Sequence, residues 1–236
     1  MEGSMPRAKL NIINVLGLIL SVACAQPALA GNANLMNANF ILAGLKVEKQ
    51  TEQLEKAQLF GISAKAYADT RAFTKWHSVL ARFDYEFKQG ISTYQGQAWA
   101  KFLAKLKGQN AYIQARAVNA YFNRIKFRDD TKNWGQKDLW ATPFEFMQRG
   151  GDCEDYAIAK YISLRALGVA ENALHLTVVF DHATKLPHAI LVLNEKNGQN
   201  WILDNQTPRL APAQLLQTRY QPIFGLNQKA WWHYGV

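Results

Sequence analysis

Apolar residues recur at helical spacing up to Gly168 and at alternate positions after it. The helical spacing predicts helices over residues 63 to about 87, 93–106 and 110 to about 125. The alternation predicts strands over residues 176–180, 188–193, 201–204, 220–224 and 231–234. Helices followed by consecutive strands predict an α+β fold, in which N-terminal helices pack on an antiparallel β-sheet of four or more strands.

A turn-rich segment follows the first predicted helices. Residues 127–141 contain many turn formers, which predicts an irregular segment. Thr142 then begins a short helix, because its side chain can cap the first turn and Glu145 can complete a capping box. Pro143 suits the first helical position. Residues 150–151 are both glycine, and they reverse the chain after this helix.

A longer helix is predicted from Asp152, a natural N-cap with Asp155 three residues on, to Gly168, which stops it. Cys153 lies in its first turn. The sulfur is therefore close to unpaired backbone N–H groups and to the positive end of the helix dipole, which favour a thiolate. The acids around it, Asp152, Glu154 and Asp155, oppose the thiolate through like-charge repulsion.

Residues 1–30 have the features of a signal peptide. A positively charged start precedes an apolar stretch at 12–23, which is too short to span a bilayer comfortably, and residues 28–30 form a small-x-small cleavage site. We therefore expect export and cleavage after Ala30, with no membrane-spanning segment left in the mature chain. Residues 31–58 are then an N-terminal extension, whose structure the pattern does not predict.

Export changes the meaning of the two cysteines. Cleavage leaves Cys153 as the only thiol, without a partner for an intramolecular disulfide, which points to a functional role. A small buried structural cysteine is the alternative, which the three neighbouring acids disfavour. Processing as a lipoprotein through Cys24 is also possible, but Ser21 stands where an aliphatic residue is usual.

The formal net charge of +9 comes from lysines and arginines scattered singly or in pairs. The sequence has no basic run and no ribbon of arginine and aromatic residues such as single-strand binders use. A nucleic-acid partner is therefore not expected.

A histidine and a carboxylate come together in the predicted sheet. If Leu193 pairs with Trp201, then Ile190 lies opposite Asp204, and His188 is diagonal to Asp204 on the same face. A one-residue slip would separate them. Asp204 taken alone could instead begin an Asx turn.

The order of these parts is papain-like: Cys153 on a helix, then His188 and Asp204 on neighbouring strands. Such a triad needs a thiol nucleophile, an imidazole that takes its proton, and a carboxylate that holds the imidazole in the useful tautomer. The register favours His188, and His182, in a loop, is the runner-up. The remaining histidines are His77, His175 and His233.

The acids beside Cys153 suggest a metal. A bound Ca²⁺ would relieve the repulsion, because clustered carboxylates and loop carbonyls are its preferred ligands. The spacing is not that of an EF-hand. The alternative is that Asp152, Glu154 and Asp155 only stabilise the helix N-terminus.

Specific motifs surround these residues: Trp134-Gly135, DLWATPFEF at 138–146, GDCEDYAIAKY at 151–161, LRALG at 164–168, then His188 and LDN at 203–205. Over roughly residues 59–234 the chain resembles the bacterial transglutaminase-like cysteine proteinases, and within them the periplasmic LapG type. The WATP and GDCEDY segments are the most specific.

The resemblance implies a papain/transglutaminase-like core at 59–236, with Cys153, His188 and Asp204 as the catalytic triad. It also implies that Asp152, Glu154 and Asp155 help to hold a calcium ion needed for activity. Members of this type reside in the periplasm and cut a large surface adhesin near its N-terminus at a di-alanine site, which releases it and promotes biofilm dispersal. They are sequestered by the periplasmic domain of an inner-membrane cyclic-di-GMP receptor of the LapD type.

Two other functions fit the same residues. A protein-glutamine acyltransferase, or transglutaminase, would use the same triad, and a non-catalytic module would use the acids only to bind calcium. For the peptidase we expect the Cys153 backbone N–H in the oxyanion hole. A side chain from residues 134–140 is a candidate second donor.

Overall fold

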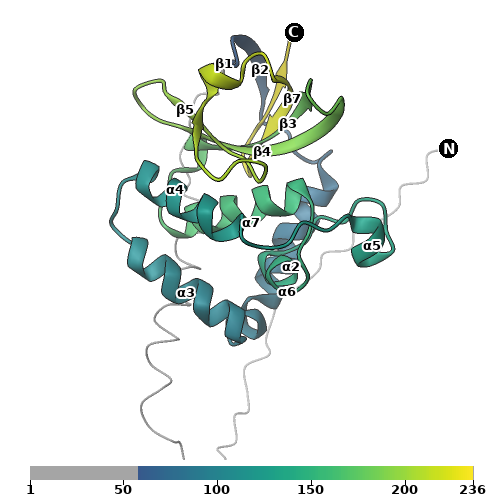
Figure 1. Cartoon of the computed structure of the whole chain (residues 1–236), viewed down its shortest axis with the longest axis vertical. Helices are drawn as coiled ribbons and strands as arrows, with labels where there is room; N and C mark the ends of the chain where they lie inside the picture. Colours follow the sequence, from purple (N-terminus) through teal and green to yellow (C-terminus); the bar gives the residue numbers. More distant parts are fainter. Residues whose placement is uncertain (1–57, 236) are drawn as a thin grey trace, which may run out of the picture.

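The computed structural model describes residues 58–235, in which a layer of helices covers one face of a curled antiparallel sheet (Figure 1). This arrangement confirms the predicted α+β fold. The predicted signal peptide at 1–30 and the extension at 31–58, apart from its last residue, lie outside the described residues, as does residue 236. Within residues 58–235, no helix is long and apolar enough to span a bilayer.

The sheet has eight strands in the order β1-β2-β8-β7-β3-β4-β5-β6. They are β1 (Gln58–Leu59), β2 (Ile62–Tyr67), β3 (Leu174–Asp181), β4 (Leu186–Asn194), β5 (Asn200–Leu203), β6 (Ala211–Pro212), β7 (Tyr220–Leu226) and β8 (Trp231–Tyr234). All the predicted strands are present. The sheet curls far enough that Asn200 Nδ2 in β5 donates a hydrogen bond to the Gln58 carbonyl oxygen in β1 at 3.1 Å.

The two faces of the sheet belong to two apolar cores. Leu176 and Leu191 point toward the helices and join the larger core. Val179 and Ile190, on the other face, join a second core inside the curl. Because both faces are covered, β4 is apolar along most of its length rather than strictly alternating.

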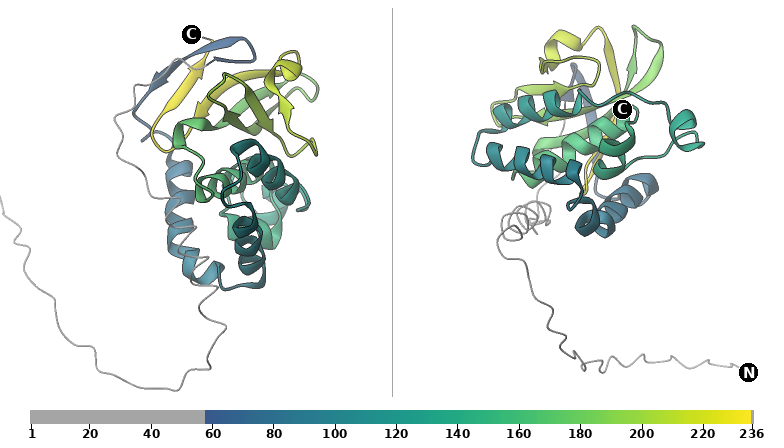
Figure 2. Two further views of the ribbon diagram at one scale, coloured as in Figure 1. Left: turned by 90° about the vertical axis from the view of Figure 1, so that its left-hand side faces the viewer. Right: turned by 60° about the horizontal axis from the view of Figure 1, so that its bottom comes forward.

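The helices are α2 (Thr74–Gly90), α3 (Tyr94–Leu106), α4 (Ala111–Phe122), α5 (Asp130–Trp134), α6 (Pro143–Arg149) and α7 (Cys153–Ala166), with 3₁₀ turns η1 (Glu171–Ala173) and η2 (Ala213–Leu216). The predicted capping box of α6 is present, between Thr142 and Glu145. α7 packs on β3 and β4 and against α4 and α6 (Figures 1 and 2). Residues 155–166 of α7 are all buried, whereas residues 152–154 at its start are half-buried.

Two sequence predictions were wrong in part. Residues 63–67 do not begin the first helix but belong to β2, which pairs with β8 so that Ala64 lies opposite Tyr234. Ala66 lies seven residues before Phe73 and so fits the helical stripe of α2, although the strand that pairs with this segment, β8, is far along the chain. The segment 127–141 is not wholly irregular, because it contains α5.

Candidate active site

The turn before α7 is built from two glycines. Gly150 has a φ of 79°, a conformation that favours glycine. At Gly151 a Cβ atom would lie 2.0 Å from Asp155 Oδ2, so a side chain would displace this carboxylate. Asp155 accepts hydrogen bonds from the backbone N–H groups of Asp152 at 3.2 Å and Ala141 at 2.7 Å. These bonds fix the start of α7 against the preceding segment.

Cys153 is the first residue of α7 and carries a free thiol. Its Sγ donates a hydrogen bond to Glu154 Oε2 at 3.2 Å. Burial raises the pKa of the thiol, and the charge of Glu154 raises it further, whereas the backbone N–H of Ala189 in β4 lowers it. The acids thus oppose the thiolate as expected, and burial adds to their effect.

His188 in β4 and Asp204, immediately after β5, form a buried pair. Nε2 of His188 lies 2.9 Å from Asp204 Oδ1, and the exposed fractions of the two side chains are 6% and 1%. The predicted register is confirmed, because Leu193 pairs with Trp201. Since a carboxylate only accepts hydrogen bonds, the proton of a neutral His188 lies on Nε2, and Nδ1 is left as the base.

Two further groups hold the Asp204 carboxylate. The Tyr220 hydroxyl donates to Oδ2 at 2.6 Å, and the backbone N–H of Gln206 donates to Oδ1 at 2.9 Å. Burial alone would raise the pKa of Asp204, but the hydrogen bond and charge of His188, together with these two donors, lower it overall. The carboxylate of Asp204 therefore stays ionised beside the imidazole.

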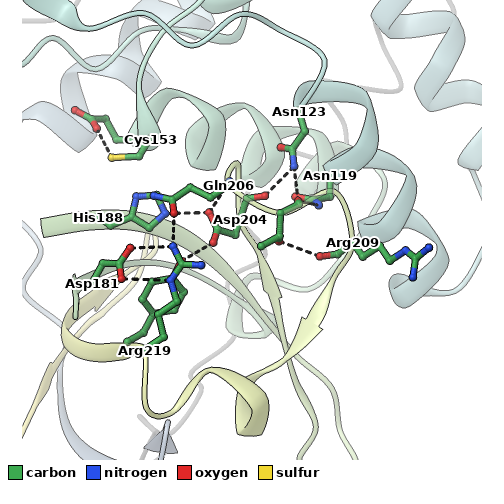
Figure 3. A network of polar contacts seen from close by, with 12 residues as sticks. Asn119, Asn123, Cys153, Asp181, His188, Asp204, Gln206, Arg209 and Arg219 are labelled. Atoms are coloured by element: carbon green, nitrogen blue, oxygen red, sulfur yellow. Dashed lines mark hydrogen bonds and ion pairs between the residues drawn. The ribbon is translucent and has the colours of Figure 1, made fainter. Parts of the chain in front are cut away.

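Arg219 connects these supports (Figure 3). Its guanidinium donates to both oxygens of Asp181, at 3.2 and 2.9 Å, and also to Gln206 Oε1. The same guanidinium lies 4.8 Å from the centroid of the Tyr220 ring. Arg219 thus contacts both Tyr220 and Gln206, the two residues that support the Asp204 carboxylate in addition to His188.

The thiol and the imidazole come from packed elements. α7 packs on β4, and the Cys153 sulfur contacts the backbone N–H of Ala189, the residue after His188. Figure 3 shows the sulfur on the side of the network where the His188 ring lies. Among the residues described, the hydrogen bond of this thiol goes to Glu154.

The other histidines lie in different surroundings. His175 stacks on Trp232 with ring centroids 3.8 Å apart, and His77 Nε2 lies 2.9 Å from the Thr70 carbonyl oxygen. His182, the runner-up, follows β3 and lies against Phe180. Within residues 58–235, His188 is the histidine that contacts a carboxylate.

Five carboxylates gather around the N-terminus of α7. The predicted acids Asp152, Glu154 and Asp155 are joined by Asp130 of α5 and by Asp138. Asp130, Asp138 and Glu154 form one group and Asp130, Asp152 and Asp155 another, and within each group the ligand atoms lie within 4.8 Å of one another. Asp130 therefore connects the predicted acids to the preceding segment.

This donor set fits a hard cation. Oδ1 of Asp130 and Oδ1 of Asp152 are buried without a hydrogen-bond partner among the residues described. Burial first, and then the neighbouring carboxylates, raise the pKa of Asp152 to about 9 and that of Asp155 to about 8. The pKa of Glu154 is also raised, chiefly by burial. Buried oxygens that repel one another in this way are typical ligands for Ca²⁺.

Sequence reasoning missed Asp130, Asp138 and the supporting residues of Asp204. The two acids lie in a segment interpreted as irregular, although its concentration of acids next to the motif was a usable signal. Nothing local marks Tyr220, which reaches Asp204 only through the order of strands.

Of the expected oxyanion donors at 134–140, Trp140 Nε1 donates to Asp138 at 3.1 Å, while Trp134 Nε1 is buried without a partner in the described part of the chain.

The sequence matches a known protein family. The profile of the bacterial transglutaminase-like cysteine proteinases (BTLCP) matches residues 95–233, and the chain therefore belongs to this family. The helices on a curled antiparallel sheet are accordingly a transglutaminase-like α+β fold. A comparison with curated proteins gives no match.

Solved structures of Legionella pneumophila LapG are similar to this chain. One is 28% identical, with a TM-score of 0.56, and the match covers 62% of this chain and 84% of that one. An EGTA-treated form is 28% identical with a TM-score of 0.57, covering 63% and 83%. A calcium-bound form is 27% identical with a TM-score of 0.56, covering 65% and 90%. The similarity thus extends over most of the LapG structures.

Proposed function

We propose that this protein is a calcium-dependent cysteine endopeptidase of the LapG type, with Cys153, His188 and Asp204 as its triad. The observation that carries the proposal is the buried 2.9 Å contact between His188 Nε2 and Asp204 Oδ1. His188 lies in β4, the strand that packs against the helix bearing Cys153. Membership of a cysteine proteinase family supports peptide-bond cleavage as the reaction.

The residues have separate roles in the reaction. Nδ1 of His188 takes the proton of Cys153, and the sulfur attacks the scissile carbonyl carbon. His188 then gives the proton to the leaving amine, and the acyl group remains on the sulfur. Water, deprotonated by His188, attacks the thioester and releases the acid and the free thiol. Asp204 holds the imidazole in the tautomer that these transfers require.

The oxyanion formed in the attack needs hydrogen-bond donors. The backbone N–H of Cys153, in the first turn of α7, is one of the groups that such a helix leaves unpaired. Trp134 Nε1 is the better candidate for a second donor, because Trp140 Nε1 already donates to Asp138.

Asp152, Glu154 and Asp155 would hold the calcium ion, together with Asp130 and Asp138. Bound calcium supplies the positive charge that this cluster lacks. Glu154, once its charge is compensated, no longer opposes the ionisation of Cys153. The calcium-bound form of Legionella pneumophila LapG supports this assignment.

The proposal extends to the cellular role. The enzyme resides in the periplasm after loss of residues 1–30, and it cleaves a large surface adhesin near its N-terminus at a di-alanine site. This cleavage releases the adhesin and promotes biofilm dispersal. The periplasmic domain of an inner-membrane cyclic-di-GMP receptor of the LapD type restrains the enzyme. The motif resemblance and the similarity to LapG support this role.

The test is incubation with an N-terminal adhesin fragment that contains a di-alanine site, with Ca²⁺ or EGTA, followed by mass measurement. We expect two new chain ends with Ca²⁺, and none with EGTA or with Cys153→Ala. Cleavage by a folded Cys153→Ala variant would refute the triad. Adding a labelled primary amine separates the rival reaction, because incorporation of the label without new chain ends would identify a transglutaminase.

A further inference from the structure

Arg128 lies against the glycine turn that precedes Cys153. Its backbone N–H donates to the Gly151 carbonyl oxygen at 2.8 Å, and Phe127 pairs with Gly151 in a parallel bridge. A Cβ atom at Gly150 would lie 3.3 Å from Arg128 Cγ, so the side chain of Arg128 covers the turn. An exposed guanidinium is thereby attached to the backbone that carries the nucleophile.

Arg149 brings a second guanidinium to the same turn. It is the last residue of α6, directly before Gly150, and its guanidinium lies 4.4 Å from the centroid of the Trp134 ring. The neighbouring Asn133 donates from Nδ2 to the Gly150 carbonyl oxygen at 3.1 Å. Trp134 is therefore fixed beside the turn, and Arg149 is held on its ring.

Neither arginine has an acidic partner within residues 58–235. Asp138 pairs with Lys75, Glu145 pairs with Arg82, and Asp129 caps α5. The remaining nearby acids belong to the carboxylate cluster at the N-terminus of α7. Lys126, also exposed, adds a further positive charge next to the turn. Guanidinium groups that form no ion pair within this part of the chain keep their donors available for a carboxylate of a ligand.

An exposed apolar residue adjoins these charges in the sequence. Phe127 lies between Lys126 and Arg128 and is 56% exposed. The segment that joins α4 to α6, with α5, extends to one side of the helical layer (Figures 1 and 2). We call the exposed side chains of Lys126, Phe127, Arg128 and Arg149 the arginine surface.

We propose that the arginine surface binds the protein substrate on one side of the scissile bond and selects a segment with carboxylate side chains beside an apolar residue. This inference rests on the proposed peptidase function, because a polypeptide bound at Cys153 reaches the surface within a few extended residues. Guanidinium groups bind carboxylates bidentately, which gives orientation as well as affinity. The basic residues look scattered in the sequence, and the turn at Gly150 gathers them.

The test uses two peptides with the same di-alanine centre, one flanked by Asp, Glu and Leu and the other by Asn, Gln and Leu. In low salt, we expect kcat/KM for the acidic peptide to exceed that for the amide peptide by at least about tenfold, the effect of losing a charge-assisted hydrogen bond. High salt should reduce this preference, because it screens the charges. Arg128→Gln with Arg149→Gln should bring the ratio near one. The matched control, Lys101→Gln with Lys105→Gln on α3, removes the same charge from the other side of the helical layer and should retain the preference.

Binding to the Cys153→Ala variant, measured by fluorescence anisotropy of the labelled peptides, separates this inference from the proposed function. If the acidic peptide binds through Arg128 and Arg149 but neither peptide is cleaved by the wild-type enzyme, the surface stands and the peptidase assignment fails. Equal kcat/KM for the two peptides, or a preference that survives the double arginine variant, would overturn the surface. Arginine-dependent binding to phosphatidylglycerol vesicles without any peptide preference would assign it to a membrane instead.

Discussion

The Tyr220 hydroxyl donates a 2.6 Å hydrogen bond to Asp204 Oδ2, while His188 bonds the other carboxylate oxygen. Tyr220 lies in β7, His188 lies in β4, and Asp204 immediately follows β5, so two strands of the sheet hold the carboxylate. The Tyr220 ring centroid also lies 5.9 Å from that of His188. In the proposed triad, Tyr220 would be a positioning residue, which acts on the imidazole through Asp204.

Removing this hydroxyl tests the relationship. A hydrogen bond to a charged group contributes roughly 1.5–3 kcal/mol, so Tyr220→Phe should lower kcat by about tenfold or more with little change in KM. Combined with Asp204→Asn, the same change should cost little more, because its target is already lost. The coupling between Tyr220 and Asp204 is measured by steady-state cleavage of one adhesin peptide by the wild type, the two single variants and the double variant.

Tyr234→Phe is the matched control for that experiment. Tyr234 is buried in the same core, and its hydroxyl makes no hydrogen bond within residues 58–235. Its removal should leave kcat near the wild-type value. Equal losses in Tyr220→Phe and Tyr234→Phe, or full additivity with Asp204→Asn, would show that the hydroxyl matters only for packing.

Calcium should stabilise the fold through the acids of α5 as well as those of α7. At 100 times its Kd a ligand adds about 2.7 kcal/mol to the free energy of unfolding, which for a chain of this size raises Tm by roughly 5–10 °C. Asp130→Asn should reduce this rise, because Asp130 belongs to both carboxylate groups. Thermal unfolding with Ca²⁺ and with EGTA measures it.

Asp129 provides the comparison for that measurement. Its carboxylate caps α5 by accepting the Thr131 N–H at 3.0 Å, and asparagine can replace it in that role. Asp129→Asn should therefore keep the full calcium-dependent rise in Tm. If Asp130→Asn also keeps it, Asp130 is not a ligand.

Without calcium, the stability should fall as the pH rises. The folded-state pKa values of Asp152 and Asp155, about 9 and about 8, lie above the ordinary value of 3.8. Between pH 3.8 and about pH 8, the folded state binds more protons at these two groups than the unfolded state does. The free energy of unfolding therefore decreases with increasing pH in this range. Tm in EGTA should be lower at pH 7 than at pH 5, and saturating Ca²⁺ should remove most of the difference. If Tm in EGTA is instead higher at pH 7 than at pH 5, the pKa values of Asp152 and Asp155 are not raised as the cluster predicts.

Local chemistry made much of this site predictable. The caps at Thr142 and Asp152 and the glycine turn define where α7 begins, and the apolar alternation of β4 and β5 sets the register that joins His188 to Asp204. Tyr220 could not be predicted in the same way, because β7 and β5 are separated by β3 and β4 in the sheet, and Tyr220 reaches Asp204 only through the curl. The acids around Asp130 did give a signal in the sequence. The prediction of helix at 63–67 was wrong for a similar reason, because this segment pairs with β8, which is far from it in the sequence.

Lys160 is a buried lysine on α7, the helix that begins at Cys153. It lies two turns along α7 from Cys153, is completely buried, and its Nζ has no hydrogen-bond partner in the described part of the chain. Nζ lies 5.6 Å from the centroid of the Tyr156 ring, and Asp204 is near enough to favour the charged form. Burial nevertheless lowers the pKa of Lys160 from 10.5 to about 7.

Lys160→Met should therefore stabilise the protein, and more at low pH. Because the folded-state pKa of Lys160 is depressed, Lys160 binds more protons in the unfolded state between pH 7 and 10.5, so its destabilising contribution shrinks as the pH rises across that window. Below pH 7 the full cost of burying the charge remains, on the order of 5 kcal/mol as an upper bound. Tm of Lys160→Met should exceed that of wild type clearly at pH 6 and much less at pH 9.5, while Lys101→Met on the exposed face of α3 should show no such trend. A lower Tm for Lys160→Met at pH 6 would mean that Lys160 stabilises the fold through Asp204.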